Sequence, residues 1–250
     1  GAVTVVGSRR PSAYGRDTAV LLGRELAAAG FAVVSGMALG IDSCAHEGAL
    51  AAGGLTVAVL GGGAEVPSPP RMQRLYREIV AAGIVISELP PGARPRRWTF
   101  PARNRIMAAL GAMSVVVEAR LRSGSLITAD LAQQLGREVG AVPGRARTSS
   151  AAGTNQLLRD GAQLIRSGQD ALDSLLGPGV RSVGPKPAGE LEPELAAVLE
   201  LVEAGAGTLD AVAREGGIAA SDAGAALARL ELIGRIGCDL AGRYRPLAPD

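Results

Sequence analysis

Five arginines stand close together between residues 91 and 105, where the chain has no acidic residue. They are Arg94, Arg96, Arg97, Arg103 and Arg105, and the same stretch holds Trp98, the only tryptophan, and Phe100, one of two phenylalanines. A guanidinium group is a fork of donors that matches phosphate oxygens, and a flat aromatic ring stacks on an unstacked base. This combination predicts a site for single-stranded nucleic acid, with Phe100 and Trp98 as candidates for base stacking. Burial in the packing of a sheet is the alternative for both rings.

A second group of polar residues follows the first apolar run of the chain, at positions 7 to 10. Gly7 lets the backbone approach an anion, Ser8 offers a hydroxyl group, and Arg9 adds a guanidinium fork beside the amides of the following helix. We expect a phosphate cradle here; the alternative is an ordinary turn with solvated arginines. The dinucleotide fingerprint G-x-G-x-x-G is missing, and no acidic ribose partner follows the second apolar run, which disfavours a dinucleotide-dependent oxidoreductase.

A third group combines serine and glycine at the start of an apolar helical pattern, beside Arg120 and Arg122. Backbone amides at the start of a helix attract anions, so this segment predicts another phosphate contact. The residues concerned are Ser123, Gly124, Ser125 and Thr128. Helix capping by one of the two serines is the alternative, and it needs no ligand.

Two further polar segments leave their roles open. Asp42 and His46 are four residues apart, so a helix places them on one face, either as a general base or, the interpretation we favour, as a pair that anchors the loop. Residues 143–155 form a polar segment with Arg145 and Arg147. It is interpreted as a further phosphate contact or a lip over the site, or as a solvated connection between elements.

The scarcity of cysteine and histidine limits the chemistry that the chain can perform. Cys44, Cys238 and His46 are the only residues of these types, so the usual four-ligand zinc site cannot be assembled. A Ser-His-Asp or Cys-His catalytic group would have to use His46, and no G-x-S-x-G elbow accompanies it. We therefore expect no metal, no cofactor and no catalytic residue.

No apolar run of about 18 residues and no signal peptide are present, so we expect no membrane partner and a cytoplasmic location. The chain opens abruptly on an apolar run, which suggests that preceding residues were removed from a longer protein.

The elements that must position these groups follow from the apolar pattern. Short, continuously apolar runs alternate with helical stretches, which predicts a Rossmann-like, doubly wound α/β domain with a mostly parallel sheet. The predicted strands cover residues 2–6, 31–34, 56–60, 84–87, 113–117 and 139–142. Several of them end in glycine or serine, and the carboxyl ends of parallel strands form the ligand crevice of such sheets.

The last quarter of the chain has a different character. Residues 177–190 are rich in proline and glycine and predict a linker between a first domain, residues 1–176, and a second, residues 191–250. Helices predicted over 193–204, 208–215 and 219–232, with Thr208 and Ser221 near their starts, precede a strand over 233–240 and a turn, the outline of a winged helix. Residues 1–189 hold 21 basic and 13 acidic side chains, whereas residues 190–250 hold 5 and 11. The first domain is therefore the predicted polyanion binder, and the second is assigned a protein-contact or packing role.

Taken in order, the motifs resemble those of the DNA-processing protein A family, also called DprA or Smf. The resemblance is carried by residues 7–9, 33–42, 45–46, 86–88, 100–105, 117–118, 123–129, 142–144 and 153–155. It implies a homodimer that binds and protects single-stranded DNA and loads the recombinase RecA in natural transformation. The residues that it assigns to phosphate or DNA binding are Gly7, Ser8, Arg9, Arg103, Asn104, Arg105, Ser123, Gly124, Ser125 and Thr128. Arg9 is the principal expected contact, with Arg103 and Arg105 beside it, whereas Arg94, Arg96 and Arg97 are expected to supply only a diffuse field.

The main rival is a nucleotide phosphoribohydrolase of the lysine-decarboxylase-like group, which shares this kind of domain. That group uses P-G-G-x-G-T-x-x-E, and the corresponding segment of this chain has Leu131 where the glutamate would stand. Asp130 is adjacent, but a shift of one residue rotates a helical side chain by about 100°. The sequence therefore favours a binding protein that is not an enzyme.

Overall fold

The computed structural model describes residues 1–180, 192–232, 235–238 and 242–246. The chain divides into two compact units, Gly1–Val183 and Gly184–Asp250. Most of the predicted linker, from residue 181 on, lies outside the described residues.

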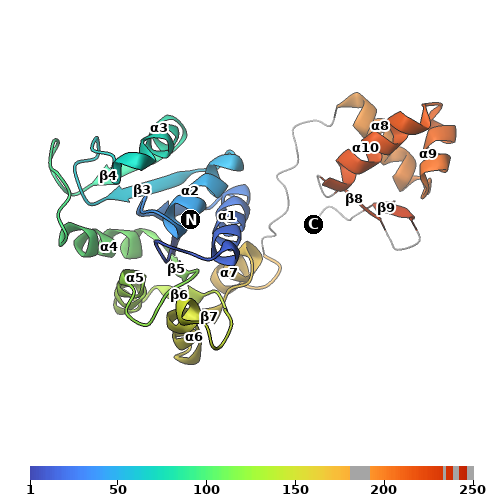
Figure 1. Ribbon diagram of the computed structural model, residues 1–250. Helices are drawn as coiled ribbons and strands as arrows, with labels where there is room; N and C mark the ends of the chain where they lie inside the picture. Colours follow the sequence, from blue (N-terminus) through green and yellow to red (C-terminus); the bar gives the residue numbers. More distant parts are fainter. Residues whose placement is uncertain (181–191, 233–234, 239–241, 247–250) are drawn as a thin grey trace. The chain divides into compact units, whose positions relative to one another are not determined.

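In the described part of the first unit, seven strands form one parallel sheet (Figure 1). The strands are β1 Ala2–Val6, β2 Ala32–Ser35, β3 Thr56–Leu60, β4 Ile84–Ser87, β5 Met113–Val116, β6 Glu138–Ala141 and β7 Gln163–Leu164. Their order is β4-β3-β2-β1-β5-β6-β7, with Val3 opposite both Val33 and Met113. The predicted doubly wound, mostly parallel fold is confirmed.

Helices cover both faces of the sheet, as the continuously apolar strands require. On β1, Val3 and Val5 pack into one core and Val6 into the other. The first core is completed by α1 Ala13–Ala28, α2 Ile41–Ala51 and α7 Gly168–Leu176, and α3 Gln73–Ala82 packs beside α2. The second is completed by α4 Thr99–Leu110, α5 Gly124–Gln134 and α6 Ala152–Arg159, and the short 3₁₀ helices η1 Pro70–Met72 and η2 Ser149–Ala151 lie in loops. Among the described residues, no helix combines the length and apolar character needed to cross a membrane.

The chain reverses its direction across the sheet between β1 and β5. From β1 it moves outward through β2 and β3 to β4, and then α4 carries it back so that β5 pairs with β1. At such a switch point the loops after the two central strands diverge and leave a crevice at the carboxyl edge of the sheet. The polar motifs after β1 and β5 therefore lie on opposite sides of one opening.

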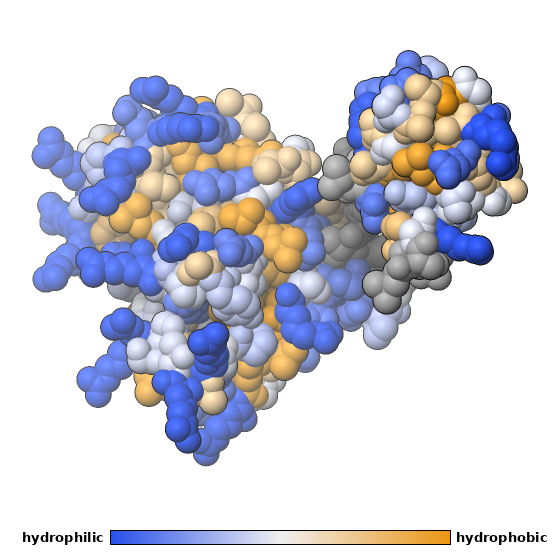
Figure 2. All heavy atoms as spheres, turned by 45° about the vertical axis from the view of Figure 1, so that its right-hand side comes forward, coloured by the Kyte–Doolittle hydropathy of each residue, from blue (hydrophilic) through white to orange (hydrophobic). Residues whose placement is uncertain are grey.

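The six predicted strands agree with the observed ones to within one residue at each end, and β7 was missed. β7 is only two residues long and exposed, so it has no apolar run to reveal it. Figure 2 shows hydrophilic side chains projecting from much of the visible surface of this unit, with apolar residues between them.

The second unit contains the predicted winged helix. Its elements are α8 Pro193–Glu203, α9 Leu209–Gly216, α10 Ala220–Leu232, β8 Ile236–Cys238 and β9 Tyr244–Pro246, and the two strands pair antiparallel. Thr208 caps α9 by accepting a hydrogen bond from the Ala211 amide, as expected, whereas Ser221 lies inside α10. Leu227, Leu230 and Ile236 form a separate apolar core. Residues 233–234 and 239–241 of the predicted strand and turn lie outside the described residues.

Candidate nucleic-acid interface

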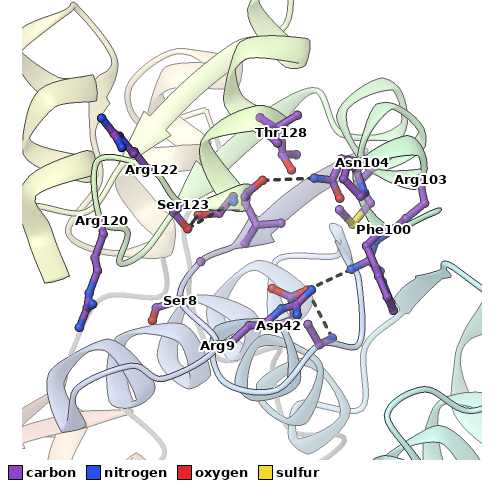
Figure 3. A pocket seen from close by; sticks show the side chains of 18 of the residues that line it. Ser8, Arg9, Asp42, Phe100, Arg103, Asn104, Arg120, Arg122, Ser123 and Thr128 are labelled. Carbon is purple, nitrogen blue, oxygen red and sulfur yellow. Dashed lines mark hydrogen bonds and ion pairs between the residues drawn. The ribbon is translucent and has the colours of Figure 1, made fainter. Parts of the chain in front are cut away.

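A crevice of about 530 Å³ opens at the switch point between β1 and β5. Three segments line most of it: the loop after β1, helix α4 with the residues before it, and the loop from β5 into α5. Figure 3 shows the side chains of these segments facing one another across the opening. The three polar motifs of the sequence are thereby brought together, although the first and the third are more than a hundred residues apart in the chain.

Exposed arginines surround the crevice. Of the described residues that line it, Arg9, Arg97, Arg120 and Arg122 are exposed arginines, and none of them takes part in a salt bridge with another described residue. The Arg9 guanidinium carbon lies 5.5 Å from the centre of the Phe100 ring, a cation–π contact that holds this arginine at the crevice wall. Unpaired guanidinium groups from three segments give the crevice a concentrated positive charge.

Arg103 lines the crevice, but its side chain is buried and bonded to the protein, which differs from the expectation of a free phosphate ligand. Its Nη1 donates hydrogen bonds to the carbonyl oxygens of Gly36 and Val59, and its Nη2 lies 3.9 Å from the Asp42 carboxylate. A Cβ atom on Gly36 would overlap the guanidinium group, so the glycine makes the slot that Arg103 fills. Arg103 therefore anchors α4 to the ends of β2 and β3.

Asp42 stabilises the loop between β2 and α2 by hydrogen bonds to its backbone. Its Oδ2 accepts hydrogen bonds from the amides of Gly36, at 3.2 Å, and Ala38, at 3.4 Å, on either side of Met37, whose φ of 52° is left-handed. Burial raises the pKa of Asp42, and the Arg103 guanidinium opposes that rise. Asp42 thus anchors the loop, as was expected of it together with His46.

Asp42 and His46 do not form a pair. The Nδ1 atom of the buried His46 is 2.6 Å from the Thr56 hydroxyl, and burial, helped by Arg103, lowers the pKa of His46 to about 3. His46 is therefore neutral and belongs to the core of the domain rather than to the crevice.

The start of α5 supplies hydroxyl groups and backbone amides to the crevice. Ser123 caps the helix by accepting from the Ser125 amide at 3.4 Å, and the two serine hydroxyls are 2.8 Å apart. Thr128 is 1% exposed and its hydroxyl, which points toward the crevice in Figure 3, has no hydrogen-bond partner among the described residues. Asn104 braces this wall by donating to the Gly124 carbonyl at 3.2 Å, which ties α4 to α5. Capping and anion binding are therefore compatible here.

The start of α1 is not available to a phosphate, which corrects part of the expected cradle. The helix begins only at Ala13, and the carboxylate of the buried Glu118 accepts from the Ser12 amide at 3.2 Å and from its hydroxyl at 2.6 Å. A Cβ atom on Gly15 would lie 2.6 Å from Glu118 Oε2, so a glycine makes room for this carboxylate. An internal anion thus occupies the helix start, and the loop of Ser8 and Arg9 alone faces the crevice.

Gly7 has a packing role. A Cβ atom there would lie 2.7 Å from the Ile41 side chain and 3.0 Å from the Glu118 carbonyl, so this glycine closes the end of β1 against α2 and β5. The Ser8 hydroxyl accepts from the Arg10 amide at 3.1 Å, which leaves its own proton free to donate.

Two predicted residues lie outside the crevice lining. Arg105 forms an exposed ion pair with Glu88, and Trp98 is 62% exposed at the start of α4. Phe100 lines the crevice with Arg9 over its ring, and base stacking on either ring stays a prediction.

Sequence reasoning left three crevice arginines out of the site. Arg97 was assigned to a diffuse field, and Arg120 and Arg122 were noted only as neighbours of the serine motif. The available clue was position: Arg120 and Arg122 follow β5, and residues just after the central strands of a parallel sheet line its crevice.

Comparison with known protein families shows to which family the chain belongs. A family model described as DNA recombination-mediator protein A matches residues 1–176, and a model of the DprA winged helix domain matches residues 184–239. The chain belongs to the DprA/Smf family. The family resemblance seen in the motifs is thereby confirmed for both units.

Relatives within the DprA/Smf family are similar over both sequence and structure. The putative DNA processing protein DprA of Mycobacterium tuberculosis is 41% identical over 251 residues, which cover 98% of this chain and 64% of the relative. The structure of DprA from Streptococcus pneumoniae superposes with a TM-score of 0.65 at 41% identity, covering 70% of this chain and 61% of that one. DprA from Helicobacter pylori, whose structure concerns its single-stranded DNA binding mode, gives a TM-score of 0.64 at 35% identity over 70% of this chain and 80% of that one.

Proposed function

We propose that the crevice binds single-stranded DNA through its phosphate backbone. The observation that carries the proposal is the convergence of Arg9, Arg97, Arg120 and Arg122, exposed and without salt bridges among the described residues, on the switch point of the sheet. Membership in the DprA/Smf family and the similarity to the H. pylori protein support it.

The geometry favours a nucleic-acid backbone over a single small anion. The arginines are spread around an opening of about 530 Å³ rather than gathered at one point, so they suit successive phosphates of a strand. One phosphate would lie at the start of α5, where Ser123, Ser125 and Thr128 offer hydroxyl groups. Backbone contacts carry no base information, so this part of the interface gives little sequence preference.

We further propose that the chain is not an enzyme. Within the described lining of the crevice, Asp42 is the only carboxylate, and it is committed to the amides of Gly36 and Ala38 and to Arg103. Leu131 packs partly buried against the core below α5, and Asp130 is exposed outside the crevice lining. The described lining of the crevice therefore offers no free carboxylate to act as a general acid or base on a bound nucleotide.

For the whole protein we propose a cytoplasmic homodimer that protects incoming single strands and loads RecA onto them in natural transformation. Family membership supports this role. In a dimer, two crevices on one strand raise the affinity without new contacts. The exposed Leu164 and Leu176, in the segment from residue 153 to 176, support self-association through this segment, and the acidic winged-helix unit suits contact with a protein.

Fluorescence anisotropy with a labelled 20-nucleotide single strand, and with a duplex of the same length, tests the binding proposal. Each phosphate contact contributes about 0.7 to the slope of log affinity against log salt for a single strand, so Arg9→Ala is expected to weaken binding and to lower that slope by about 0.7. Arg105→Ala removes the same charge outside the crevice and serves as the control. An Arg9→Ala protein with unchanged affinity and slope would overturn the proposal.

Three parallel assays test the finer claims. Incubation with nucleoside monophosphates is expected to release no free base, and turnover would instead establish the phosphoribohydrolase. Light scattering coupled to gel filtration is expected to give the mass of a dimer, and RecA filaments are expected to form faster on a labelled single strand when the protein is present. A monomer, or an unchanged filament rate, would contradict the corresponding claim.

A further inference from the structure

A second pocket, of about 540 Å³, lies beside the crevice at the carboxyl ends of β5 and β6. Two segments lie between the pocket and the crevice. In the segment after β1, Ser8 and Arg9 line the crevice, and Ser12 and Tyr14 line the second pocket. In the segment after β5, Glu118 lines the second pocket, and Arg120 and Arg122 line the crevice. A DNA strand held in the crevice therefore has a second cavity beside it for its next nucleotides.

This pocket is unsuited to phosphate. Its wall includes the buried carboxylate of Glu118, which already occupies the start of α1 through Ser12. A second anion at that place would be repelled by the carboxylate, and it would find the Ser12 amide bonded to Glu118 and the Gly15 amide bonded to the Ser12 hydroxyl. The pocket must take an uncharged group if it takes part of a nucleic acid.

The remaining walls suit a flat, partly apolar group. Tyr14 and Pro143 supply apolar surface, and the Tyr14 hydroxyl donates to the Pro143 carbonyl at 3.1 Å, which fixes a ring that stays 54% exposed. Thr148 and Ser150 add hydroxyl groups, and the exposed Arg145 stands at the same pocket as a cation for the backbone of an entering strand. Aromatic, hydroxyl and cationic groups around one cavity are the components of a base-binding subsite.

Glu118 also has unused acceptor capacity. An ionised carboxylate offers about four lone-pair sites, and among the described residues only the amide and hydroxyl of Ser12 donate to it. The amino groups of cytosine, adenine and guanine donate hydrogen bonds, and glutamate accepts from the cytosine amino group in known base contacts. Uracil and thymine present a carbonyl oxygen at the same position, which a carboxylate repels.

We propose that the second pocket receives one base of the bound strand and prefers bases that carry an amino group, with Glu118 as acceptor and Tyr14 as the stacking surface. This inference rests on the proposed binding of single-stranded DNA in the crevice. It adds a modest base preference at one position to an otherwise sequence-independent interface.

Competition between deoxycytidine and deoxyuridine 20-mers, measured by anisotropy on the full chain, tests the inference. The tracts have equal charge and length and lack the thymine methyl group, so they differ in the base edge alone. One hydrogen bond to a charged acceptor predicts about tenfold tighter binding of the cytidine tract. Tyr14→Ala removes the stacking surface and Thr148→Trp fills the pocket from its exposed rim; both are expected to bring the ratio close to one. Arg147→Ala, in the same loop but outside the pocket lining, is expected to keep the wild-type ratio.

The outcomes separate the two proposals. Equal binding of both tracts by the wild-type protein would overturn the base pocket while leaving the crevice intact, and so would a preference that survives in both folded pocket variants. Failure to bind either tract would refute the proposed function itself. Circular dichroism of each variant establishes that it is folded.

Discussion

Replacement of Arg103 by alanine is expected to destabilise the Rossmann-like unit rather than to remove a DNA contact. The substitution leaves the Asp42 carboxylate buried without its cation, and it leaves the Gly36 and Val59 carbonyl oxygens without their donor. Removal of one partner of a buried ion pair costs about 3 to 5 kcal/mol, because the other charge stays buried. Since domains of this size are stable by about 5 to 15 kcal/mol, the variant should retain a folded but much weakened unit.

Urea unfolding followed by tryptophan fluorescence measures this loss in the relevant unit. Trp98 is the only tryptophan of the chain and stands at the start of α4, the helix that carries Arg103. With a urea dependence of about 2 kcal/mol per molar, a loss of 3 kcal/mol moves the midpoint down by about 1.5 M. Arg105→Ala, two residues along the same helix, breaks only the exposed pair with Glu88 and should cost about 1 kcal/mol or less.

The salt dependence of DNA binding distinguishes the two roles of Arg103. A folded Arg103→Ala protein should keep the wild-type slope of log affinity against log salt, because its guanidinium group is committed to the protein. Unchanged stability together with a slope smaller by about 0.7 would show that Arg103 is a phosphate ligand and would refute the structural assignment.

Three further outcomes follow from the same contacts. Arg122→Ala is expected to lower the salt slope by about 0.7 with no change in the urea midpoint, and a slope equal to that of the wild-type protein would remove Arg122 from the interface. Gly15→Ala places a Cβ 2.6 Å from the Glu118 carboxylate and disturbs the hydrogen bonds between Glu118 and Ser12, so it is expected to lower the free energy of unfolding by about 1 to 3 kcal/mol. An unchanged midpoint in a thermal melt would contradict this expectation. The pKa of His46 is lowered to about 3 in the folded state, so as the pH falls His46 is protonated in the unfolded chain before it is protonated in the folded protein. The free energy of unfolding therefore has its full His46 contribution above about pH 6.5 and decreases as the pH falls toward 3. Between pH 8 and pH 5, His46 is expected to lower the free energy of unfolding by about 2 kcal/mol. Urea midpoints at the two pH values measure this loss, and the His46→Gln variant is expected to lack the His46 part of it.

Most of the sheet was readable from the sequence because its central strands are largely buried. β1, β3 and β4 are short, mainly apolar segments with the bounds predicted for them, and the polar motifs directly after β1 and β5 mark the crevice. The winged helix was readable for a similar reason, since the three helices present regular apolar faces to the core around Leu227.

The roles of individual arginines were not readable in the same way. Arg103 and Arg105 are two residues apart in the same helix, yet one is buried against Gly36 and the other is exposed beside Glu88. The slot for Arg103 is built from carbonyl groups of two other segments, and backbone carbonyls have no sequence signature. The capture of the α1 start by Glu118 escaped prediction for the same reason, because the carboxylate arrives from a residue 106 positions away from Ser12.

The arginines that line the crevice form two groups, one buried in the fold and one exposed at its rim. Arg103 is held in place by two carbonyl groups beside a glycine, so its replacement weakens the fold. Arg97, Arg120 and Arg122 are exposed and lie outside the helices and strands, so substitution of their side chains is expected to change the stability little. The affinity for a polyanion can therefore change over a wide range, by natural substitution or by engineering, while the fold that carries these arginines stays the same.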